Sequence, residues 1–142
     1  MTMTDKFQIL GRFIKDMSSE TKNTETYIFV KDRISQYQLD IKIHSKAIKN
    51  NMVEINTILK FEDKKEAKYK SYFEMTYATI VKISDKIKDK KDLERIILCD
   101  AQIKIYPDLK KSFLNLLHDS GYSDVKFEKK IDFEKLYNQR FN

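Results

Sequence analysis

A chain of 142 residues with 41% hydrophobic and 12% aromatic residues is long and apolar enough to fold as one domain, residues 1–142. Its single cysteine excludes an internal disulfide framework and any multi-cysteine metal site. No charged-then-apolar leader opens the sequence, and no apolar run approaches the roughly 20 residues that a membrane helix needs. These features predict a protein of the reducing cytoplasm that does not insert into membranes.

The formal net charge is +6, from 28 Lys and Arg against 22 Asp and Glu. A basic surface is typical of proteins that bind nucleic acids. Here, however, the lysines alternate with acidic residues in the segments 61–70 and 84–95, and mixed runs of this kind are usually solvated faces. A nucleic-acid-binding module is therefore kept as an alternative hypothesis, and it predicts steeply salt-dependent binding to DNA or RNA.

The first half of the chain, about residues 6–83, predicts four strands with short connections, which favours an antiparallel meander. A polar segment at 17–26 follows the first strand, and the pair Asn50-Asn51 predicts a turn between the second and third. The charged segment 61–68 predicts a second hairpin turn. The expected strands cover, in order, residues 6–16, 37–48, 50–61 and 69–84.

Two of these strands alternate apolar and polar side chains, which predicts one face for the core and one for solvent. In the fourth strand, Tyr72 and Glu74 point away from the apolar side. The apolar side of the second and fourth strands consists of Leu39, Ile41, Ile43, Phe73, Met75 and Tyr77.

The second half, about residues 91–141, predicts helices. The segment 90–106 is apolar nearly all round, so we expect it to be buried from several directions and to lie between subunits of an oligomer. Pro107 predicts a break or restart of the helix, and Gly121 predicts the end of the next one. The apolar residues of the first helical segment are Leu93, Ile96, Ile97, Leu98, Cys99, Ala101, Ile103 and Ile105.

A last short helix is expected at 132–141, with Asp132 as its N-cap. Its residues Phe133, Leu136, Tyr137 and Phe141 are expected to face inward. Strands followed by helices predict an α+β domain, in which a four-stranded antiparallel sheet carries the helices on one face.

Catalytic and metal-binding patterns are missing from the sequence. Two glycines leave no room for a glycine-rich phosphate loop, and His44 and His118 lie far apart. Cys99 falls in an apolar helix, where a thiol is usually structural. Asp40 and His44 share one face of a strand, but no nucleophile accompanies them. We therefore predict a protein that is not an enzyme and that uses no metal and no cofactor.

Three collinear segments form a more specific pattern. Residues 7–20 read FQI, an aromatic residue, a Lys-Asp pair and Ser-x-Glu, and residues 72–83 read YFEMTYATIVKI. Residues 105–140 contain an aromatic-Pro pair, a glycine, a short extended return and Asp-Phe-x-x-Leu. In order and spacing these segments resemble the SecB family of protein-export chaperones over nearly the whole chain.

The resemblance implies a four-stranded antiparallel sheet with helices on one face, assembled as a dimer of dimers. It implies an ATP-independent holdase that binds unfolded or slowly folding preproteins in apolar grooves between sheet and helices. The residues that match the family's client groove are Leu39, Ile41, Ile43, Phe73, Met75 and Tyr77. Aromatic residues and methionine suit a promiscuous binder, although an ordinary core or a subunit interface is the alternative for each position.

The family also delivers its clients to the motor protein SecA. The matching residues are Asp16, Glu20, Tyr72 and Glu74, and carboxylates on a flat outer surface attract a basic partner. Simple solvated carboxylates are the alternative. The family is typically acidic, whereas this chain is basic and has almost no tail after its last helix. A SecB-like chaperone that protects an antitoxin in a toxin–antitoxin system is therefore the alternative within the class.

Overall fold

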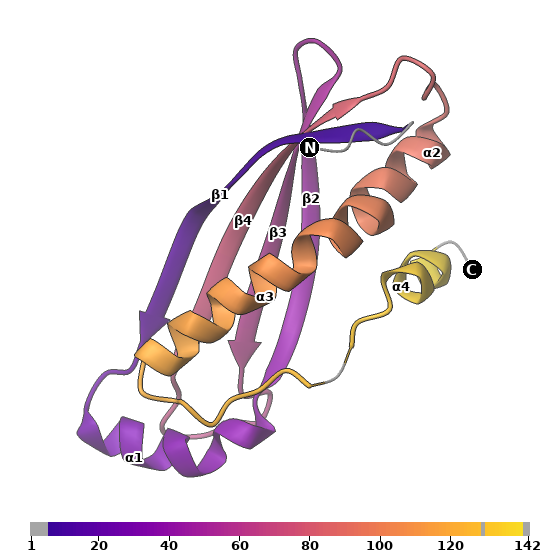
Figure 1. Cartoon of the computed structure of the whole chain (residues 1–142). Coiled ribbons are helices and arrows are strands. Elements are labelled where there is room, and N and C mark those ends of the chain that lie inside the picture. The colour runs from indigo at the N-terminus through magenta and orange to yellow at the C-terminus, as the bar shows by residue number, and fades with distance from the viewer. Residues whose placement is uncertain (1–5, 129, 141–142) are drawn as a thin grey trace.

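The computed structural model describes residues 6–128 and 130–140, and it confirms the expected α+β architecture. A four-stranded antiparallel sheet forms one layer, and a long helix crosses the face that we call inner (Figure 1). The strands are β1 (Phe7–Glu20), β2 (Gln38–Ile48), β3 (Met52–Glu62) and β4 (Tyr72–Ile83). The helices are α1 (Thr24–Arg33), α2 (Lys90–Arg95), the π-helical segment η2 (Ile96–Asp100), α3 (Ala101–Asp119) and α4 (Phe133–Arg140), with a short 3-10 turn, η1 (Ile34–Gln36), after α1.

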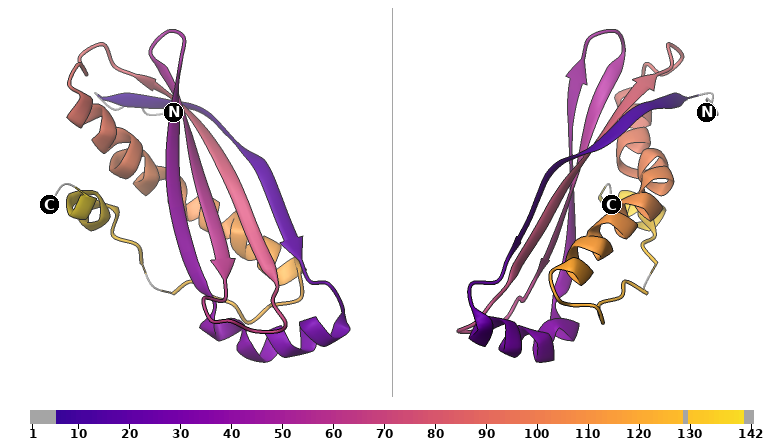
Figure 2. Two further views of the ribbon diagram at one scale, coloured as in Figure 1. Left: turned by 180° about the vertical axis from the view of Figure 1, so that it is seen from behind. Right: turned by 60° about the vertical axis from the view of Figure 1, so that its left-hand side comes forward.

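The strand order is β1-β4-β3-β2, so only β2, β3 and β4 form the expected meander. The prediction of a meander of all four strands is wrong, because β1 pairs with β4, with Phe7 opposite Ile83 and Glu20 opposite Tyr72. The physical reason is the connection between β1 and β2. It contains α1 and passes across the end of the sheet, so β1 and β2 become the two edges (Figure 2).

The segment 17–26, expected to be a polar connection, completes β1 and begins α1. Asn23 is the N-cap of α1, since its side-chain oxygen accepts the N–H of Thr26 at 2.9 Å. Glu25 in the first turn and Arg33 in the last turn both suit the helix dipole. These capping and charge signals are present in the sequence and mark the helix that the strand pattern obscures.

The pair Asn50-Asn51 forms the expected turn between β2 and β3. Both residues adopt the left-handed conformation, with φ values of 63° and 60°, in the three-residue loop 49–51 between the paired residues Ile48 and Met52. Asparagine tolerates this conformation better than most residues. The turn fixes the register of the hairpin, in which Ile43 faces Thr57 and Ile41 faces Leu59.

The segments α2, η2 and α3 follow one another without a break, and Pro107 lies inside α3. The prediction that Pro107 breaks the helix is therefore wrong. Proline removes one backbone N–H and crowds the preceding turn. Ile105 and Leu109, on either side of it, are fully buried against the sheet, and this packing keeps the backbone helical.

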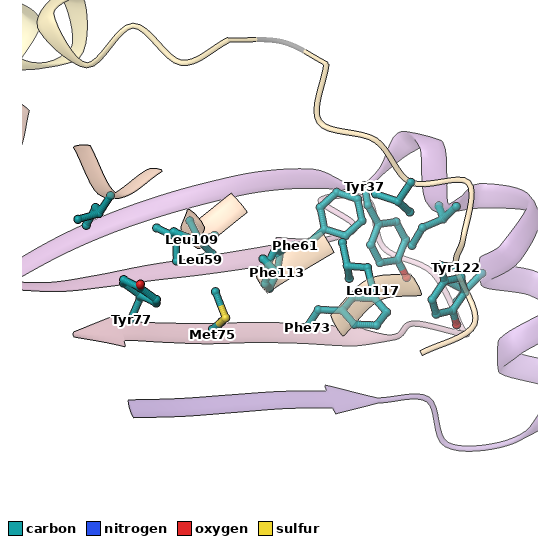
Figure 3. Close-up of a cluster of buried hydrophobic side chains, with 14 residues drawn as sticks. Tyr37, Leu59, Phe61, Phe73, Met75, Tyr77, Leu109, Phe113, Leu117 and Tyr122 are labelled. Atoms are coloured by element: carbon teal, nitrogen blue, oxygen red, sulfur yellow. The ribbon is translucent and has the colours of Figure 1, made fainter. Parts of the chain in front are cut away.

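Two apolar clusters lie between the long helix and the sheet. The larger one packs α3 onto β3 and β4, and the smaller one packs α2 and η2 onto the opposite end of the sheet. Between them, the Gln102 amide donates to Thr57 Oγ1 at 2.9 Å, which pairs these two buried side chains. Figure 3 shows the larger cluster, in which the labelled side chains include Leu59, Phe61, Phe73, Met75, Tyr77, Leu109, Phe113 and Leu117.

Hydroxyl groups join four chain segments at the end of the sheet that α1 crosses. The side chains of Thr21, Ser71 and Tyr122 hydrogen-bond to one another at 2.7, 3.1 and 3.0 Å. The N–H of Ser71 donates to the Tyr37 hydroxyl oxygen at 3.1 Å. The network links the end of β1, the start of β4, the start of β2 and the segment after α3.

An ion pair fixes α1 to the connection between β3 and β4. Arg33 Nη2 donates to Asp63 Oδ1 at 3.2 Å, Arg33 Nε donates to Oδ2, and the N–H of Lys65 donates to Oδ1 at 3.0 Å. The hydrogen bonds from Arg33 hold the pKa of the buried Asp63 below its usual range. The carboxylate is therefore charged at neutral pH and keeps α1 against the sheet.

Gly121 ends α3 in a Schellman motif. Its N–H donates to the carbonyl of His118 at 3.1 Å, and the N–H of Tyr122 donates to the carbonyl of Leu117 at 3.0 Å. The φ of Gly121 is +104°, which residues with a side chain rarely adopt. A Cβ at this position would lie 2.6 Å from Tyr27 Cε1. The expected cap is confirmed, and the glycine also permits the close approach of α1.

We predict that Gly121→Ala lowers the free energy of unfolding by about 1–3 kcal/mol, because the alanine would combine a strained backbone with a clash against Tyr27. Urea denaturation measures the change. Gly11→Ala is the matched control, since a Cβ at Gly11 meets nothing within 4 Å. Equal destabilisation by the two substitutions would contradict the structural role given to Gly121.

Candidate functional site

A groove lies between the edge strand β2 and the C-terminal helix α4. Its volume is about 420 Å³. Figure 2 shows α4 beyond the edge of the sheet rather than over its inner face. We call this feature the β2–α4 groove. It is lined by Ile41, Lys42, Ile43 and His44 of β2, by Leu98 of η2, and by Phe133, Leu136 and Tyr137 of α4.

The helix α4 is anchored on the long helix. Arg95 Nη2 donates to Glu134 Oε1 at 2.6 Å, and the Arg95 guanidinium lies 5.5 Å from the centre of the Tyr137 ring. The rings of Tyr106 and Phe133 meet edge to face at 5.4 Å. These contacts hold α4 beside the long helix and leave a gap between α4 and β2.

The side chains of α4 are buried as its short amphipathic pattern predicts, with one exception. Asp132 accepts a backbone N–H of the first turn at 3.0 Å, which confirms the expected N-cap. Phe133 and Tyr137 are buried, as predicted. The prediction that Leu136 faces inward is wrong, because its side chain is 51% exposed and lines the groove. Phe141 lies outside the described residues.

The same helix covers the second apolar side of the long helix. Cys99, Phe133 and Tyr137 form a buried cluster, and Leu98 and Tyr106 pack against it. Much of the apolar surface from which we predicted a subunit interface is therefore covered within the chain. The oligomeric state stays a prediction.

The structure separates the residues expected to bind clients into two groups. Ile41 and Ile43 line the β2–α4 groove, and Leu39 is half-buried against the larger cluster. The remaining residues lie under α3 and belong to the core, because their side chains are only 2%, 0% and 8% exposed in the order Phe73, Met75 and Tyr77 (Figure 3).

The residues expected to bind a motor protein lie together on the outer face. Glu20 is directly opposite Tyr72 in the pairing of β1 with β4, and cross-strand partners point to the same face. Glu74 is 3.8 Å from Lys60 of β3, in an exposed ion pair of a kind that contributes only about 0–1 kcal/mol. We call the surface formed by Asp16, Glu20, Tyr72 and Glu74 the outer acidic patch.

The α4 wall of the groove was not predicted as a site. Phe133, Leu136 and Tyr137 recur at helical spacing, and a helix of this length has too little surface to form a core of its own. That pattern signals a docking helix. The surface onto which it docks is set by contacts that are distant in the sequence, such as the pair of Arg95 with Glu134.

The cysteine and one histidine of the described residues have structural surroundings. Burial raises the pKa of the Cys99 thiol, so the reactive thiolate is disfavoured. The His118 ring makes a structural hydrogen-bond contact, because its Nε2 lies 2.9 Å from the carbonyl oxygen of Val125. In the described ranges, 6–128 and 130–140, no group of three or more His, Cys, Asp or Glu residues could hold a metal ion. None of the helices in these ranges combines the length and hydropathy of a membrane span.

Comparison with known proteins identifies the family. The family profile described as preprotein translocase subunit SecB matches residues 2–142. The chain belongs to the SecB family. A protein-export protein SecB of Pelagibacter ubique is 61% identical over 140 residues, which cover 99% of this chain and 100% of the relative. A protein-export protein SecB of Methylocella silvestris is 22% identical over 131 residues, or 92% of this chain and 80% of the relative.

A solved structure shows the same fold. The SecB-like chaperone of Mycobacterium tuberculosis, in complex with a peptide from an antitoxin, superposes with a TM-score of 0.62 at 11% identity. The match covers 88% of this chain and 91% of that chain. The family profile and the names of the sequence relatives identify a protein-export chaperone with a SecB fold.

The division of the predicted residues between core and groove leads to a stability prediction. Met75→Ala removes a side chain that is fully buried under α3, so we expect unfolding free energy to fall by about 2–5 kcal/mol. Leu136→Ala removes an exposed side chain from the groove rim and is the control, with an expected change of about 0.5 kcal/mol or less. Urea denaturation of both variants provides the test. A Met75→Ala variant as stable as the Leu136→Ala variant would mean that Met75 is not a core residue.

Proposed function

We propose that this SecB-family chaperone holds unfolded or slowly folding polypeptides in the β2–α4 groove and uses no ATP. One observation carries the proposal: the inner face of the sheet is filled by α3, while the groove is an open hollow with apolar residues on both walls. Ile41 and Ile43 form one wall, and Leu136 stands exposed on the other. Exposed apolar surface of this kind marks an interaction site.

The chemistry of the groove favours promiscuous binding. Aliphatic and aromatic side chains attract apolar segments without directional bonds, so many client sequences are accepted. A site built from fixed polar groups would instead select one ligand. The same lining includes no arrangement for bond cleavage, and we propose a binding role with no catalytic step.

A charge in the groove should weaken this binding. We predict that Leu136→Glu raises the amount of protein needed to suppress aggregation of an unfolded client by about tenfold, because a carboxylate in the apolar wall loses hydration when a client binds. Light scattering of a chemically denatured client after dilution measures the effect. Ile103→Glu is the matched control, since Ile103 is 53% exposed on α3 and lies outside the groove. Equal loss of activity in the two variants would contradict the assignment of the groove.

We also propose that the outer acidic patch binds the motor SecA and that the clients are preproteins awaiting export. Support comes from the placement of Asp16, Glu20, Tyr72 and Glu74 on one face of the sheet, opposite the face that α3 covers. Carboxylates on such a surface steer a basic partner element toward it. Holding an antitoxin is the alternative, and it needs the groove but not this patch.

The two roles differ in their response to a charge reversal. We predict that Glu74→Lys weakens the binding of purified SecA about tenfold, because it places a second cation beside Lys60, and leaves aggregation suppression unchanged. Glu128→Lys, an exposed carboxylate on the segment between α3 and α4, is the control. Biosensor binding of SecA to the three proteins provides the measurement. If the unsubstituted protein does not bind SecA, the export role is contradicted and antitoxin protection is favoured.

We further propose a cytoplasmic homotetramer, built as a dimer of dimers. Support comes from β1, which is a free sheet edge with large exposed apolar side chains. Exposed apolar residues along an edge strand favour pairing with another chain. These residues are Leu10, Phe13, Ile14 and Met17.

A further inference from the structure

Lysines gather at the end of the molecule that lies away from α1. The β2–β3 hairpin, the connection from β4 to α2 and the start of β1 meet there (Figure 1). The N–H of Ile83 donates to the carbonyl oxygen of Asn51 at 2.8 Å, which joins β4 to the hairpin. The N–H of Ser84 donates to the carbonyl oxygen of Lys6 at 2.9 Å, which joins the same connection to the start of β1. We call this surface the basic end. Its lysines, all exposed, are Lys6, Lys46, Lys49, Lys82, Lys86, Lys88, Lys90 and Lys91.

Positive charge dominates the basic end. Lys6 and the segments 44–54 and 82–92 together carry eight lysines and only four carboxylates. Two of these carboxylates already bind groups of the chain, since Glu54 pairs with Lys15 at 2.7 Å and Asp89 caps α2. None of the eight lysines forms an ion pair with a carboxylate of the described residues. Their ammonium groups can therefore meet an anionic partner from outside the chain.

An exposed apolar side chain lies among these lysines. Ile48 is 40% exposed at the end of β2, between Lys46 and Lys49 in the sequence. Ile87, in the connection from β4 to α2, packs instead against the smaller apolar cluster, so that connection is anchored on the core. An exposed apolar side chain beside several lysines fits the surface of a bilayer, where ammonium groups meet lipid phosphates and the apolar group reaches the acyl boundary.

We propose that the basic end binds the surface of a bilayer that contains anionic lipids. The lysine ammonium groups pair with headgroup phosphates, and Ile48 enters the headgroup region. Clusters of about four to eight basic residues are typical of proteins that bind anionic membranes. The contact is peripheral and reversible, and its strength falls as salt screens the charges.

The same charges would attract nucleic acids, but two features of the basic end favour the bilayer. Its eight basic residues are all lysines, whereas the planar guanidinium of arginine is the better group for recognising nucleic acids. Exposed aromatic side chains, on which unpaired bases stack, are missing from the segments 44–54 and 82–92, and Phe7 beside them is buried. Ile48, moreover, has a role at a lipid surface and none on a phosphate backbone.

The basic end is separate from the surfaces that we propose for clients and for SecA. None of its eight lysines lines the β2–α4 groove, and none belongs to the outer acidic patch. The chaperone can therefore approach a membrane through the basic end while a client occupies the groove. The proposal depends on neither of those two assignments.

Co-sedimentation of the full-length protein with lipid vesicles tests the proposal. One set of vesicles contains about 30% phosphatidylglycerol in phosphatidylcholine, and the other contains phosphatidylcholine alone. Lys46→Glu combined with Lys49→Glu is expected to weaken binding to the anionic vesicles at least about tenfold, because two attractions become repulsions. The matched control combines Lys22→Glu with Lys65→Glu, two exposed lysines near α1, and is expected to bind within about twofold of the unsubstituted protein.

A third variant separates the bilayer from nucleic acid. Ile48→Ser keeps every lysine and is expected to weaken vesicle binding about threefold while leaving the binding of duplex DNA unchanged. Equal binding to neutral and anionic vesicles would overturn the proposal, and so would an equal loss in the two double variants. Tighter binding of duplex DNA than of anionic vesicles would overturn it in favour of a nucleic-acid-binding module. Suppression of client aggregation is expected to persist in all three variants, which keeps the result independent of the proposed function.

Discussion

The packing of α3 on β3 and β4 is the contact on which the rest of this molecule depends. Leu109, Phe113 and Leu117 are fully buried against the central strands, and each buried side chain of this size contributes about 1.5–3 kcal/mol. Because this contact fills the inner face, the apolar surface left for a partner lies at the edges of the sheet. On the function that we propose, clients are therefore held beside the sheet rather than on top of it.

The position of α3 also determines where the surfaces that we propose for binding partners lie. With α3 on one face, the outer face is free to carry polar residues, and Glu74 and Lys60 lie there in an exposed pair. The β2–α4 groove lies at the edge that is farthest from β1. A client in the groove would therefore lie at the opposite edge of the sheet from a second subunit at β1, whereas the outer acidic patch includes Asp16 and Glu20 of β1 and adjoins that subunit.

The sequence predicts the local features of this structure well. The alternation of apolar and polar residues along β4 identifies its buried side. Asn50-Asn51 marks a turn and Gly121 marks a helix end, because few residue types adopt the positive φ angles that these positions require. Features that depend on contacts between distant segments could not be predicted in this way. Phe73 belongs to the core only because α3 covers it, and the helix continues through Pro107 only because its neighbours are buried. The groove likewise exists because Arg95 and Glu134 hold α4 away from β2.

The π-helical turn η2 restricts changes in the number of residues in the long helix. One row of buried residues in the long helix recurs at every fourth position, and in a regular α-helix each such step runs about 40° beyond a full turn. Over many turns this drift would carry one end of the row away from the sheet. The wider turn at Ile96–Asp100 reduces the drift at the start of this row, between Ile97 of η2 and Ala101 of α3. The fold therefore depends on how many residues η2 contains as well as on which residues they are, and this count limits the insertions and deletions that the long helix can accept. The row consists of Ile97, Ala101, Ile105, Leu109, Phe113 and Leu117.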